Sequence, residues 1–291
     1  MSDHLRTLRI LTTNQCKYNC VYCHNEGHRP SYVSSPMSCD DFVRIMEAVS
    51  PLGFEEIVFS GGDPLLNPAT LDMIEWADKN TGYKITVETN GSAVTENVAA
   101  RLGDTRAMLN VHYPAAYENE FQAVTGCSID PFTQAVRFLD KYGIPHMFNF
   151  VLHPDHMSGL DGVIDHVIEA RKQILLLPYV ESGLNNISAG IIRRVTDILD
   201  STHSQKSFED DYRITVWTFG NGGKVKLMKS PCYDRDIDMC KGFGELRILP
   251  DLTLQKCRFD DDSIKLGGLS PEEIREKIDE VWNAFNACYT A

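Results

Sequence analysis

Residues 16–27 read CKYNCVYCHNEG, which places three cysteines in the spacing Cys-x3-Cys-x2-Cys at Cys16, Cys20 and Cys23. Three thiols this close together, in a chain without a secretory signal, favour metal binding over disulfide bonds. A cubane iron–sulfur cluster takes one thiolate per iron, so three cysteines leave one iron without a protein ligand. The segment therefore predicts a cluster whose open iron binds a substrate or cofactor directly.

The alternative interpretation of this segment is a structural zinc site. His24 or His28 would then supply the fourth ligand of a tetrahedral set. A non-catalytic zinc-binding module is thus the competing class of protein. The visible colour and the iron content of anaerobically purified protein distinguish the two.

Around the cysteines, short apolar runs alternate with helix-like stretches as far as residue 205. Gly, Pro or Asn bounds most of these runs, as expected for strands and helices joined by turns. The predicted strands are residues 6–12, 56–59, 84–88, 107–111, 146–151 and 173–178. The predicted helices are residues 39–49, 69–79, 95–102, 131–142, 160–171 and 187–202. Six such units predict an α/β fold, a partial (β/α)6 TIM-type barrel over residues 1–205 with its helices outside.

The strand–helix pattern ends near residue 205, and we expect a small second domain over residues 206–291. SFEDDYRITVWTF, residues 207–219, predicts a strand with an acidic lead-in, and a GNGGK turn follows it. ELRILPDLTLQKC, residues 245–257, predicts a hairpin. Ser270 and Glu273 form a capping box at the start of a final helix.

The net charge and the number of cysteines limit the classes of protein to which the chain can belong. The net charge of −13 argues against a nucleic-acid backbone or an anionic membrane as the main partner. No apolar run reaches the roughly 18 residues that a membrane-spanning helix needs. We therefore expect a cytoplasmic protein, in which the nine cysteines stay reduced.

The cysteine spacing, with the aromatic Tyr22 before the last cysteine, resembles the hallmark of the radical S-adenosylmethionine (SAM) superfamily. The resemblance implies that the open iron of a [4Fe–4S] cluster binds the amine and carboxylate of SAM. It also implies that one electron cleaves SAM to a 5′-deoxyadenosyl radical, which abstracts a hydrogen atom from the substrate. The cofactors carry this chemistry and the protein positions them.

Two further segments match this superfamily at the ends of predicted strands. SGGDP, residues 60–64, corresponds to a glycine motif that usually reads GGEP, so Asp63 is a departure. ETNG, residues 88–91, follows the third strand. Because the carboxyl ends of parallel strands meet at one barrel mouth, we expect these segments to line the SAM site. The expected SAM-binding residues are Tyr22, Ser60, Gly61, Gly62, Asp63, Glu88, Thr89, Asn90, and Asn110 or His112.

A second cysteine group lies in the expected small domain, with the spacing Cys-x7-Cys-x16-Cys at Cys232, Cys240 and Cys257. It resembles the twitch form of the auxiliary-cluster (SPASM) domain, which implies an auxiliary [4Fe–4S] cluster and a twitch-like iron–sulfur domain. Without that resemblance, these are unrelated thiols or a zinc site. Cys288 lies on the apolar face of the final helix and is either a core residue or a fourth ligand.

Across most of its length the chain is most similar to the GTP 3′,8-cyclases of molybdenum-cofactor biosynthesis. Arg9 sits where those enzymes have a triphosphate-binding arginine. Their other basic positions hold Val58, Met147 and residues 241–244, KGFG. A triphosphate needs several charge-assisted contacts, so we expect a less anionic small-molecule substrate. The candidate catalytic residues are Arg9, His112, Asn149 and Glu181.

A peptide-modifying SPASM/twitch maturase is the second enzymatic alternative. Such enzymes often have an N-terminal leader-binding domain, whereas the first cysteine motif here begins at residue 16. This favours a small-molecule substrate, although a separate partner could supply leader binding. An external reductant such as flavodoxin or ferredoxin is the expected protein partner.

Overall fold

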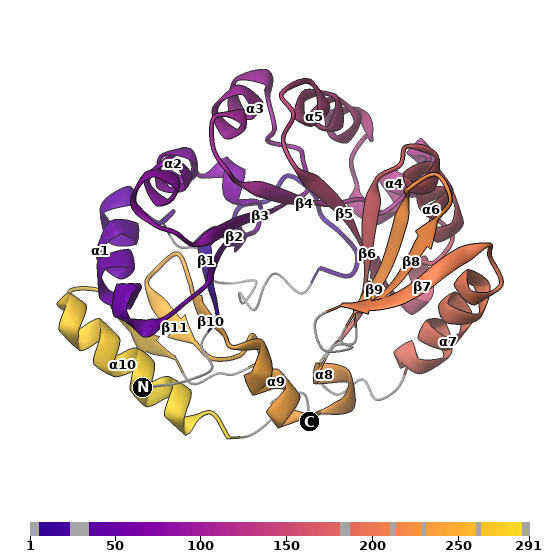
Figure 1. Cartoon of the computed structure of the whole chain (residues 1–291). Helices are drawn as coiled ribbons and strands as arrows, with labels where there is room; N and C mark the ends of the chain where they lie inside the picture. Colours follow the sequence, from indigo (N-terminus) through magenta and orange to yellow (C-terminus); the bar gives the residue numbers. More distant parts are fainter. Residues whose placement is uncertain are drawn as a thin grey trace.

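The computed structural model describes residues 6–23, 35–180, 187–209, 214–228, 231–259 and 263–286. Within these ranges twelve strands form one sheet, in the order β12-β11-β10-β1-β2-β3-β4-β5-β6-β9-β8-β7. The first six strands run parallel to one another, and the sheet curves around a common axis (Figure 1). They are β1 (Thr7–Thr13), β2 (Glu56–Gly61), β3 (Lys84–Thr89), β4 (Met108–His112), β5 (His146–Leu152) and β6 (Gln173–Pro178). The predicted α/β barrel with an open, curved parallel sheet is confirmed.

Helices connect these strands and lie outside the sheet (Figure 1). They are α1 (Cys39–Val49), α2 (Thr70–Asn80), α3 (Glu96–Gly103), α5 (Asp130–Lys141), α6 (Leu160–Glu169) and α7 (Ile187–Asp200). All six were predicted to within two residues at each end. The sequence did not predict α4 (Glu118–Thr125), which lies between β4 and α5. Its eight residues are too few for an apolar periodicity to stand out.

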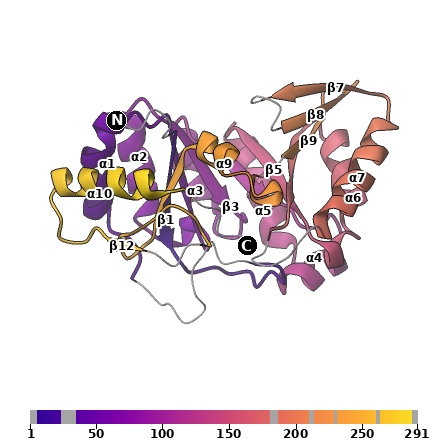
Figure 2. The ribbon, with the colours of Figure 1, turned by 90° about the horizontal axis from the view of Figure 1, so that it is seen from below.

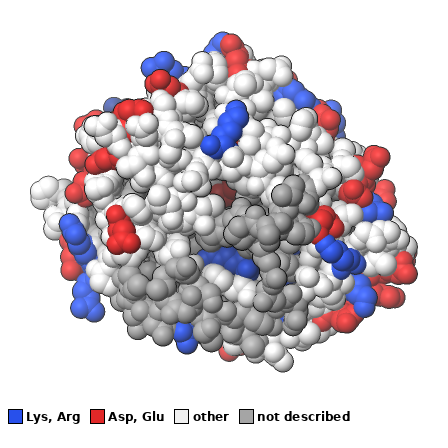
Figure 3. Space-filling model, turned by 180° about the vertical axis from the view of Figure 1, so that it is seen from behind, with Lys and Arg blue, Asp and Glu red and all other residues white. Residues whose placement is uncertain are grey.

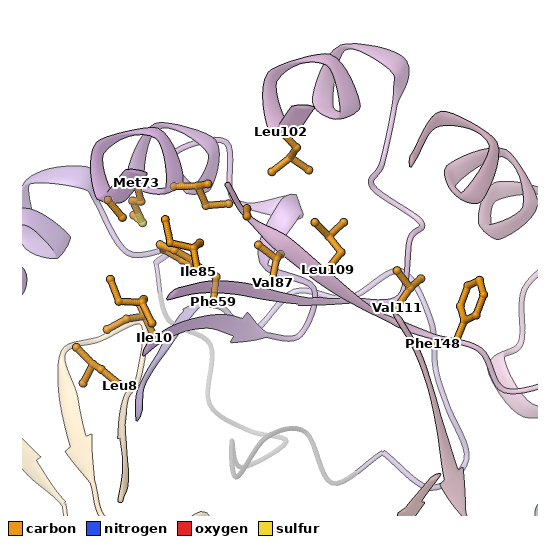
Figure 4. Close-up of a cluster of buried hydrophobic side chains, with 14 of the residues drawn as sticks. Leu8, Ile10, Phe59, Met73, Ile85, Val87, Leu102, Leu109, Val111 and Phe148 are labelled. Atoms are coloured by element: carbon orange, nitrogen blue, oxygen red, sulfur yellow. The ribbon is translucent and has the colours of Figure 1, made fainter. Parts of the chain in front are cut away.

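The main core lies between the sheet and these helices. Figure 4 shows side chains of alternate strand residues, such as Phe59, Val87 and Leu109, pointing toward the helices. All three are fully buried. Because side chains alternate across a strand, the residues between them, such as Glu88 and Asn110, face the inside of the barrel. The alternation of side chains thus gives each strand one face that packs against the helices and one face that points into the barrel, where a ligand can bind.

The chain from residue 204 to 228 forms three strands, β7 (Ser204–Glu209), β8 (Ile214–Phe219) and β9 (Lys224–Met228). Strand β8 is the strand expected within residues 207–219, but the acidic lead-in to it contains the end of a further strand, β7, that the sequence did not predict. The chain reverses between Glu209 and Ile214, which pair in the antiparallel ladder. No glycine or proline marks this reversal in the sequence, so the usual turn signal is missing. The turn at residues 220–224 is confirmed.

The last third of the chain extends the parallel sheet at both ends. Strand β9 pairs parallel with β6, and β10 (Glu245–Ile248) pairs parallel with β1. The predicted hairpin is present, since β11 (Thr253–Gln255) runs antiparallel to β10, and β12 (Ile264–Lys265) follows it. Helices α8 (Pro231–Asp234) and α9 (Ile237–Phe243) lie between the two ends of the sheet (Figure 1). The boundary of a separate domain at residues 205 and 206 stays a proposal.

The final helix, α10 (Pro271–Ala284), has the predicted capping box between Ser270 and Glu273. Its buried face, with Ile274 and Ile278, packs along α1 on the outside of the barrel (Figure 2). The Arg275 guanidinium also donates a hydrogen bond to the Ala48 carbonyl (3.2 Å). The helix therefore fastens the C-terminal part of the chain to the first strand–helix unit.

No helix in the described ranges is both long enough and apolar enough to cross a membrane.

Candidate active site at the cysteine loop

The loop that carries the first three cysteines is fastened to the barrel on two sides. The backbone N–H groups of Gly62 and Asp63 donate to the carbonyls of Thr13 (2.8 Å) and Gln15 (2.7 Å), just before Cys16. On the other side, the backbone N–H groups of residues 19 and 21 donate hydrogen bonds to backbone carbonyls at the end of α4. The loop therefore lies at the carboxyl ends of β1 and β2, where the sequence placed it.

The two glycines of the SGGDP segment are required by this contact. A Cβ atom on Gly62 would lie 2.2 Å from the Gln15 carbonyl oxygen, and one on Gly61 would lie 2.2 Å from that of Thr13. Gly61 also has a φ of +140°, which other residues rarely adopt. The sequence analysis expected these glycines to line the SAM site. The structure gives a reason within the chain, namely the close approach of the loop backbone.

Asp63 is fully buried and joins β2 to β3. Its carboxylate accepts hydrogen bonds from the Thr89 hydroxyl (3.0 and 3.1 Å), from the N–H of Leu65 (3.1 Å) and from the N–H of Asn90 (3.3 Å). Burial raises the pKa of this carboxyl, and these donors oppose that shift. The predicted SAM-binding residues Asp63 and Thr89 thus bind each other. Ser60, at the end of β2, is also buried.

Asn90 connects this strand end to the cysteine loop. Its side-chain amide donates to the Cys16 sulfur (3.2 Å). Burial raises the pKa of the Cys16 thiol to about 11 and that of Cys20 to about 12, and the neighbouring Cys23 contributes to both shifts. Three mutually close thiols on one loop, one of them already receiving an amide hydrogen bond, fit the ligand set of an iron–sulfur cluster.

A chain of hydrogen bonds crosses the inside of the barrel from the loop to β3. The Tyr22 hydroxyl lies 3.0 Å from His112 Nε2, and His112 Nδ1 lies 3.1 Å from Asn149 Oδ1. The Asn149 amide nitrogen donates to one Glu88 oxygen (3.3 Å), and that of Asn110 donates to the other (2.8 Å).

These contacts fix the tautomer of the histidine. Asn149 directs its amide nitrogen to Glu88 and its oxygen to His112. His112 Nδ1 is then the donor, and Nε2 accepts from Tyr22. Burial lowers the pKa of His112, which favours this neutral form. His112, Asn149 and Glu88 are therefore brought together as one network.

The two candidates on β4 differ in the hydrogen bonds that they already make. Both ring nitrogens of His112 are engaged by Tyr22 and Asn149. The Asn110 Oδ1 atom, in contrast, is buried and has no hydrogen-bond partner among the described residues. A buried acceptor of this kind costs free energy unless a ligand satisfies it. The Asn110 oxygen is therefore open to a hydroxyl or N–H donor of a ligand, whereas the His112 ring nitrogens are already engaged.

Three aromatic residues that the sequence did not single out pack beside Tyr22. His153 stacks on the Tyr22 ring, with centroids 5.8 Å apart, and His156 lies 5.9 Å from it. Tyr179 meets His153 edge to face at 4.6 Å. Each follows the end of β5 or β6, so position after a strand was the available signal. Together these three side chains line the mouth of the barrel next to the cysteine loop.

The remaining candidates are placed as follows. Arg9 faces the inside of the barrel, where Glu245 of β10 binds its guanidinium. Glu181 and Cys288 lie outside the described residues, as do His24 and His28 of the zinc alternative.

Two members of the second cysteine group, Cys232 and Cys257, lie near each other, and the third lies on a helix that contacts the helix of Cys232. Cys232 lies in α8, Cys240 in the adjacent α9, and Cys257 just after β11. Burial, above all, raises the pKa of Cys257, with a contribution from the nearby Cys232, while Arg247 and Arg258 lower it. The backbone N–H of residue 259 donates to the Cys257 sulfur (3.4 Å).

Within the described ranges, no three His, Cys, Asp or Glu side chains are grouped closely enough to hold a single metal ion. A cubane binds each thiolate to a different iron and does not need such a close grouping.

Comparison with known proteins identifies the family. The model of the radical SAM superfamily matches residues 10–166, just over half of the chain. The chain belongs to the radical SAM superfamily. Members use a [4Fe–4S] cluster and SAM, and the matched range contains the cysteine loop, SGGDP and ETNG. This radical SAM protein is therefore an enzyme, and the non-catalytic zinc module is no longer an alternative.

Relatives of this radical SAM enzyme are described as GTP 3′,8-cyclases. One from Yersinia pestis is 27% identical over 294 residues, covering 95% of this chain and 88% of the relative. One from Edwardsiella ictaluri is 30% identical over 286 residues, covering 92% of this chain and 84% of the relative. The resemblance to the cyclase subgroup is thus confirmed over nearly the whole chain.

Two solved structures with bound S-adenosylmethionine (AdoMet) share the fold. SuiB of Streptococcus suis bound to S-adenosylmethionine superposes with a TM-score of 0.69 at 12% identity, over 96% of this chain and 65% of SuiB. Native anSMEcpe with bound AdoMet gives 0.65 at 15% identity, over 94% and 82%. At such identities the likeness concerns the fold alone.

Proposed function

We propose that this radical SAM enzyme cleaves SAM reductively and abstracts a hydrogen atom from a small-molecule substrate of the nucleotide, cofactor or natural-product type. The observation that carries this proposal is the position of the cysteine loop. The Asp63 and Asn90 contacts hold it above the polar inner face of the barrel, where Glu88, Asn110 and His112 lie. A substrate bound on that face lies within reach of a SAM molecule held at the loop.

In this proposal, different residues of the chain have different roles. Cys16, Cys20 and Cys23 hold the catalytic [4Fe–4S] cluster, which when bound supplies the electron that cleaves SAM. Asn110 Oδ1 accepts a hydroxyl hydrogen of SAM. Tyr22, held by His112, closes one side of the site against water. An external flavodoxin or ferredoxin in the cytoplasm delivers the electron.

We also propose an auxiliary [4Fe–4S] cluster on Cys232, Cys240 and Cys257. Their placement on α8, on α9 and after β11 is the support for it. Such a cluster lies in the C-terminal region, proposed as a twitch-like domain over residues 206–291. Its role is to bind substrate or to relay an electron, and Cys288 is a possible additional ligand.

GTP 3′,8-cyclisation is the second candidate function, because the named relatives carry that description. Against it stand Val58 and Met147 at positions where the resemblance calls for basic residues. Arg9, the basic residue that is present, has its guanidinium bound by Glu245. No contact in the described residues favours a peptide substrate.

The proposal is tested by measuring 5′-deoxyadenosine after anaerobic cluster reconstitution and reduction. The wild type should produce it from SAM, and replacing the three loop cysteines with alanine should abolish it. Cys39→Ala, at the start of α1 and away from the loop, is the matched thiol control and should retain activity. Undiminished 5′-deoxyadenosine formation by the triple variant would refute the assignment.

The auxiliary cluster has a separate test by iron counting and Mössbauer spectroscopy. The wild type should bind about eight irons and a Cys240→Ala/Cys257→Ala variant about four, from four per cubane. The variant should keep SAM cleavage and lose product formation. About four irons in the wild type would contradict the proposal. Cys288→Ala decides whether that residue is a ligand.

A further inference from the structure

Tyr18 lies between two of the loop cysteines, Cys16 and Cys20, and carries a hydroxyl that makes no hydrogen bond. The residue is only 7% exposed. Its hydroxyl oxygen is buried and has no hydrogen-bond partner among the described residues. A buried hydroxyl in this state costs free energy, and such a group calls for a partner that the folded chain alone does not supply.

The surroundings of the Tyr18 ring hold it in place. The ring packs edge to face on Phe121 of α4, with centroids 5.6 Å apart and ring planes at 89°. The backbone on either side is also fixed. The Asn19 N–H donates to a backbone carbonyl at the end of α4 (2.9 Å), and the Lys17 carbonyl accepts from the Cys127 thiol (3.4 Å). The hydroxyl therefore has little freedom to turn toward a different partner.

The neighbours of this hydroxyl indicate what it can bind. Burial, above all, raises the pKa of Tyr18, and the nearby Cys127, Asp63, Cys20 and Cys16 add to the rise. The Asp63 carboxylate already accepts hydrogen bonds from β3 and from the backbone, and the Cys127 thiol donates to the loop. The acceptors that remain are the thiolates of Cys16 and Cys20, with the sulfides that accompany them in a cluster.

A hydrogen bond to a sulfur atom changes how readily an iron–sulfur cluster is reduced. The reduced cluster carries one more negative charge than the oxidised cluster, so a donated hydrogen bond stabilises the reduced state more strongly. Figure 3 shows the molecule from the side on which α4 and the cysteine loop lie (compare Figure 2), and most charged side chains on this face lie toward its rim. Hydrogen bonds from the loop itself therefore have a large share in the environment of a group held there.

We propose that the Tyr18 hydroxyl donates a hydrogen bond to a sulfur atom of the catalytic cluster and thereby raises the reduction potential of that cluster. This inference rests on the proposed function, because it requires the cluster on Cys16, Cys20 and Cys23. It gives Tyr18 a role distinct from that of the ligands. The hydroxyl makes the cluster easier to reduce, so that a weaker electron donor suffices to start SAM cleavage.

The test is a potentiometric titration of the reconstituted wild type and Tyr18→Phe, followed by electron paramagnetic resonance. The signal that changes when SAM is added to a parallel sample identifies the cluster of the loop. Tyr18→Phe keeps the ring on Phe121 and removes only the hydroxyl. At a fixed potential, the ratio of reduced to oxidised cluster should be roughly three- to tenfold lower in the variant. For one electron this is a downward shift of the midpoint potential by about 30 to 60 mV.

Tyr113→Phe is the matched control, because it also removes the hydroxyl of a buried tyrosine. That hydroxyl lies 2.6 Å from His166 Nδ1 on α6, outside the sheet. Tyr113→Phe should leave the midpoint potential unchanged and should destabilise the apoprotein in urea denaturation. The Tyr18→Phe apoprotein should be at least as stable as the wild type, since the hydroxyl that it loses has no partner there.

An unchanged midpoint potential in Tyr18→Phe would overturn the inference, as would a loss of apoprotein stability as large as that of Tyr113→Phe. If the wild type acquired no reducible cluster that responds to SAM, the proposed function would fail together with the inference. A SAM-responsive cluster of equal potential in the wild type and in Tyr18→Phe would remove this role of Tyr18 alone and leave the proposed function standing.

Discussion

At the scale of single residues, His112 illustrates how burial sets a protonation state. Its pKa lies below the ordinary value of about 6.5, chiefly because burial disfavours the imidazolium. Below pH 6.5 the unfolded chain takes up a proton at this residue before the folded protein does. The unfolded state then binds more protons, so stability is lost as pH falls through 6.5 toward the folded pKa.

Urea denaturation between pH 7.5 and 5 tests this expectation. The free energy of unfolding should decrease below about pH 6.5 in the wild type. A His112→Gln variant should show a smaller decrease over that range. Part of the dependence should remain, since burial also lowers the pKa of His146. Equal pH dependence in the two proteins would show that His112 is not buried in its neutral form.

Asp63 gives a second prediction at this scale. Asp63→Ala leaves the Thr89 hydroxyl and the N–H groups of Leu65 and Asn90 without their acceptor. We expect a loss of about 3 kcal/mol in the free energy of unfolding, together with weaker SAM binding as the two strand ends separate. Asp72→Ala, which removes an exposed ion pair with Arg101, should cost less than about 1 kcal/mol.

Sequence reasoning identified most of these residues but not what they contact. Asp63 and Asn90 were placed at the SAM site because they follow strands, whereas the structure shows that one joins two strands and the other reaches Cys16. Glu245 could not be found from the sequence. Its partner Arg9 is 236 positions away, and only the pairing of β1 with β10 brings the two together.

At the scale of elements, the contact between β2 and the cysteine loop can be tested at Gly62. Gly62→Ala introduces a Cβ 2.2 Å from the Gln15 carbonyl oxygen, so the backbone leading to Cys16 must move. We expect a loss of 2 kcal/mol or more in stability and a reduced iron content. Gly82→Ala is the matched control, because no atom lies within 4 Å of its added Cβ and its stability should change by less than about 0.5 kcal/mol.

The stability and iron content of Gly62→Ala report on the contact between β2 and the cysteine loop, because the added Cβ displaces the loop before SAM binds. A Gly62→Ala protein with normal iron content and normal stability would contradict the contact.

The elements were predicted where the sequence carries a local signal. Helix α1 begins and ends at the predicted residues, and α10 has the predicted capping box. The β7–β8 reversal and α4 were missed because neither has a local signature. The parallel pairing of β9 with β6 and of β10 with β1 was missed for another reason. Strand partners are set by tertiary packing, which no periodicity of the sequence encodes.

At the scale of the whole molecule, the C-terminal third completes both ends of the parallel sheet. A fragment ending at residue 205 would expose the edges of β1 and β6 that β10 and β9 cover. It would also lack α10, which buries part of α1. We expect this fragment to be recovered as aggregate, as exposed strand edges associate.

Sedimentation of the fragment beside the full chain is the measurement. A monomeric fragment with native-like circular dichroism would instead support a separately folding domain over residues 1–205.

The distance along the chain between β1 and β10 has a consequence during synthesis. Arg9 and Glu245 are 236 positions apart. At roughly 5–20 residues per second, the nascent β1 waits about 10 to 50 s for its partner strand to leave the ribosome. For that time one edge of the central sheet has no neighbour, and the cysteine loop stands beside an incomplete barrel. We therefore expect the soluble yield, rather than the turnover of molecules that have folded, to respond most to the conditions of expression.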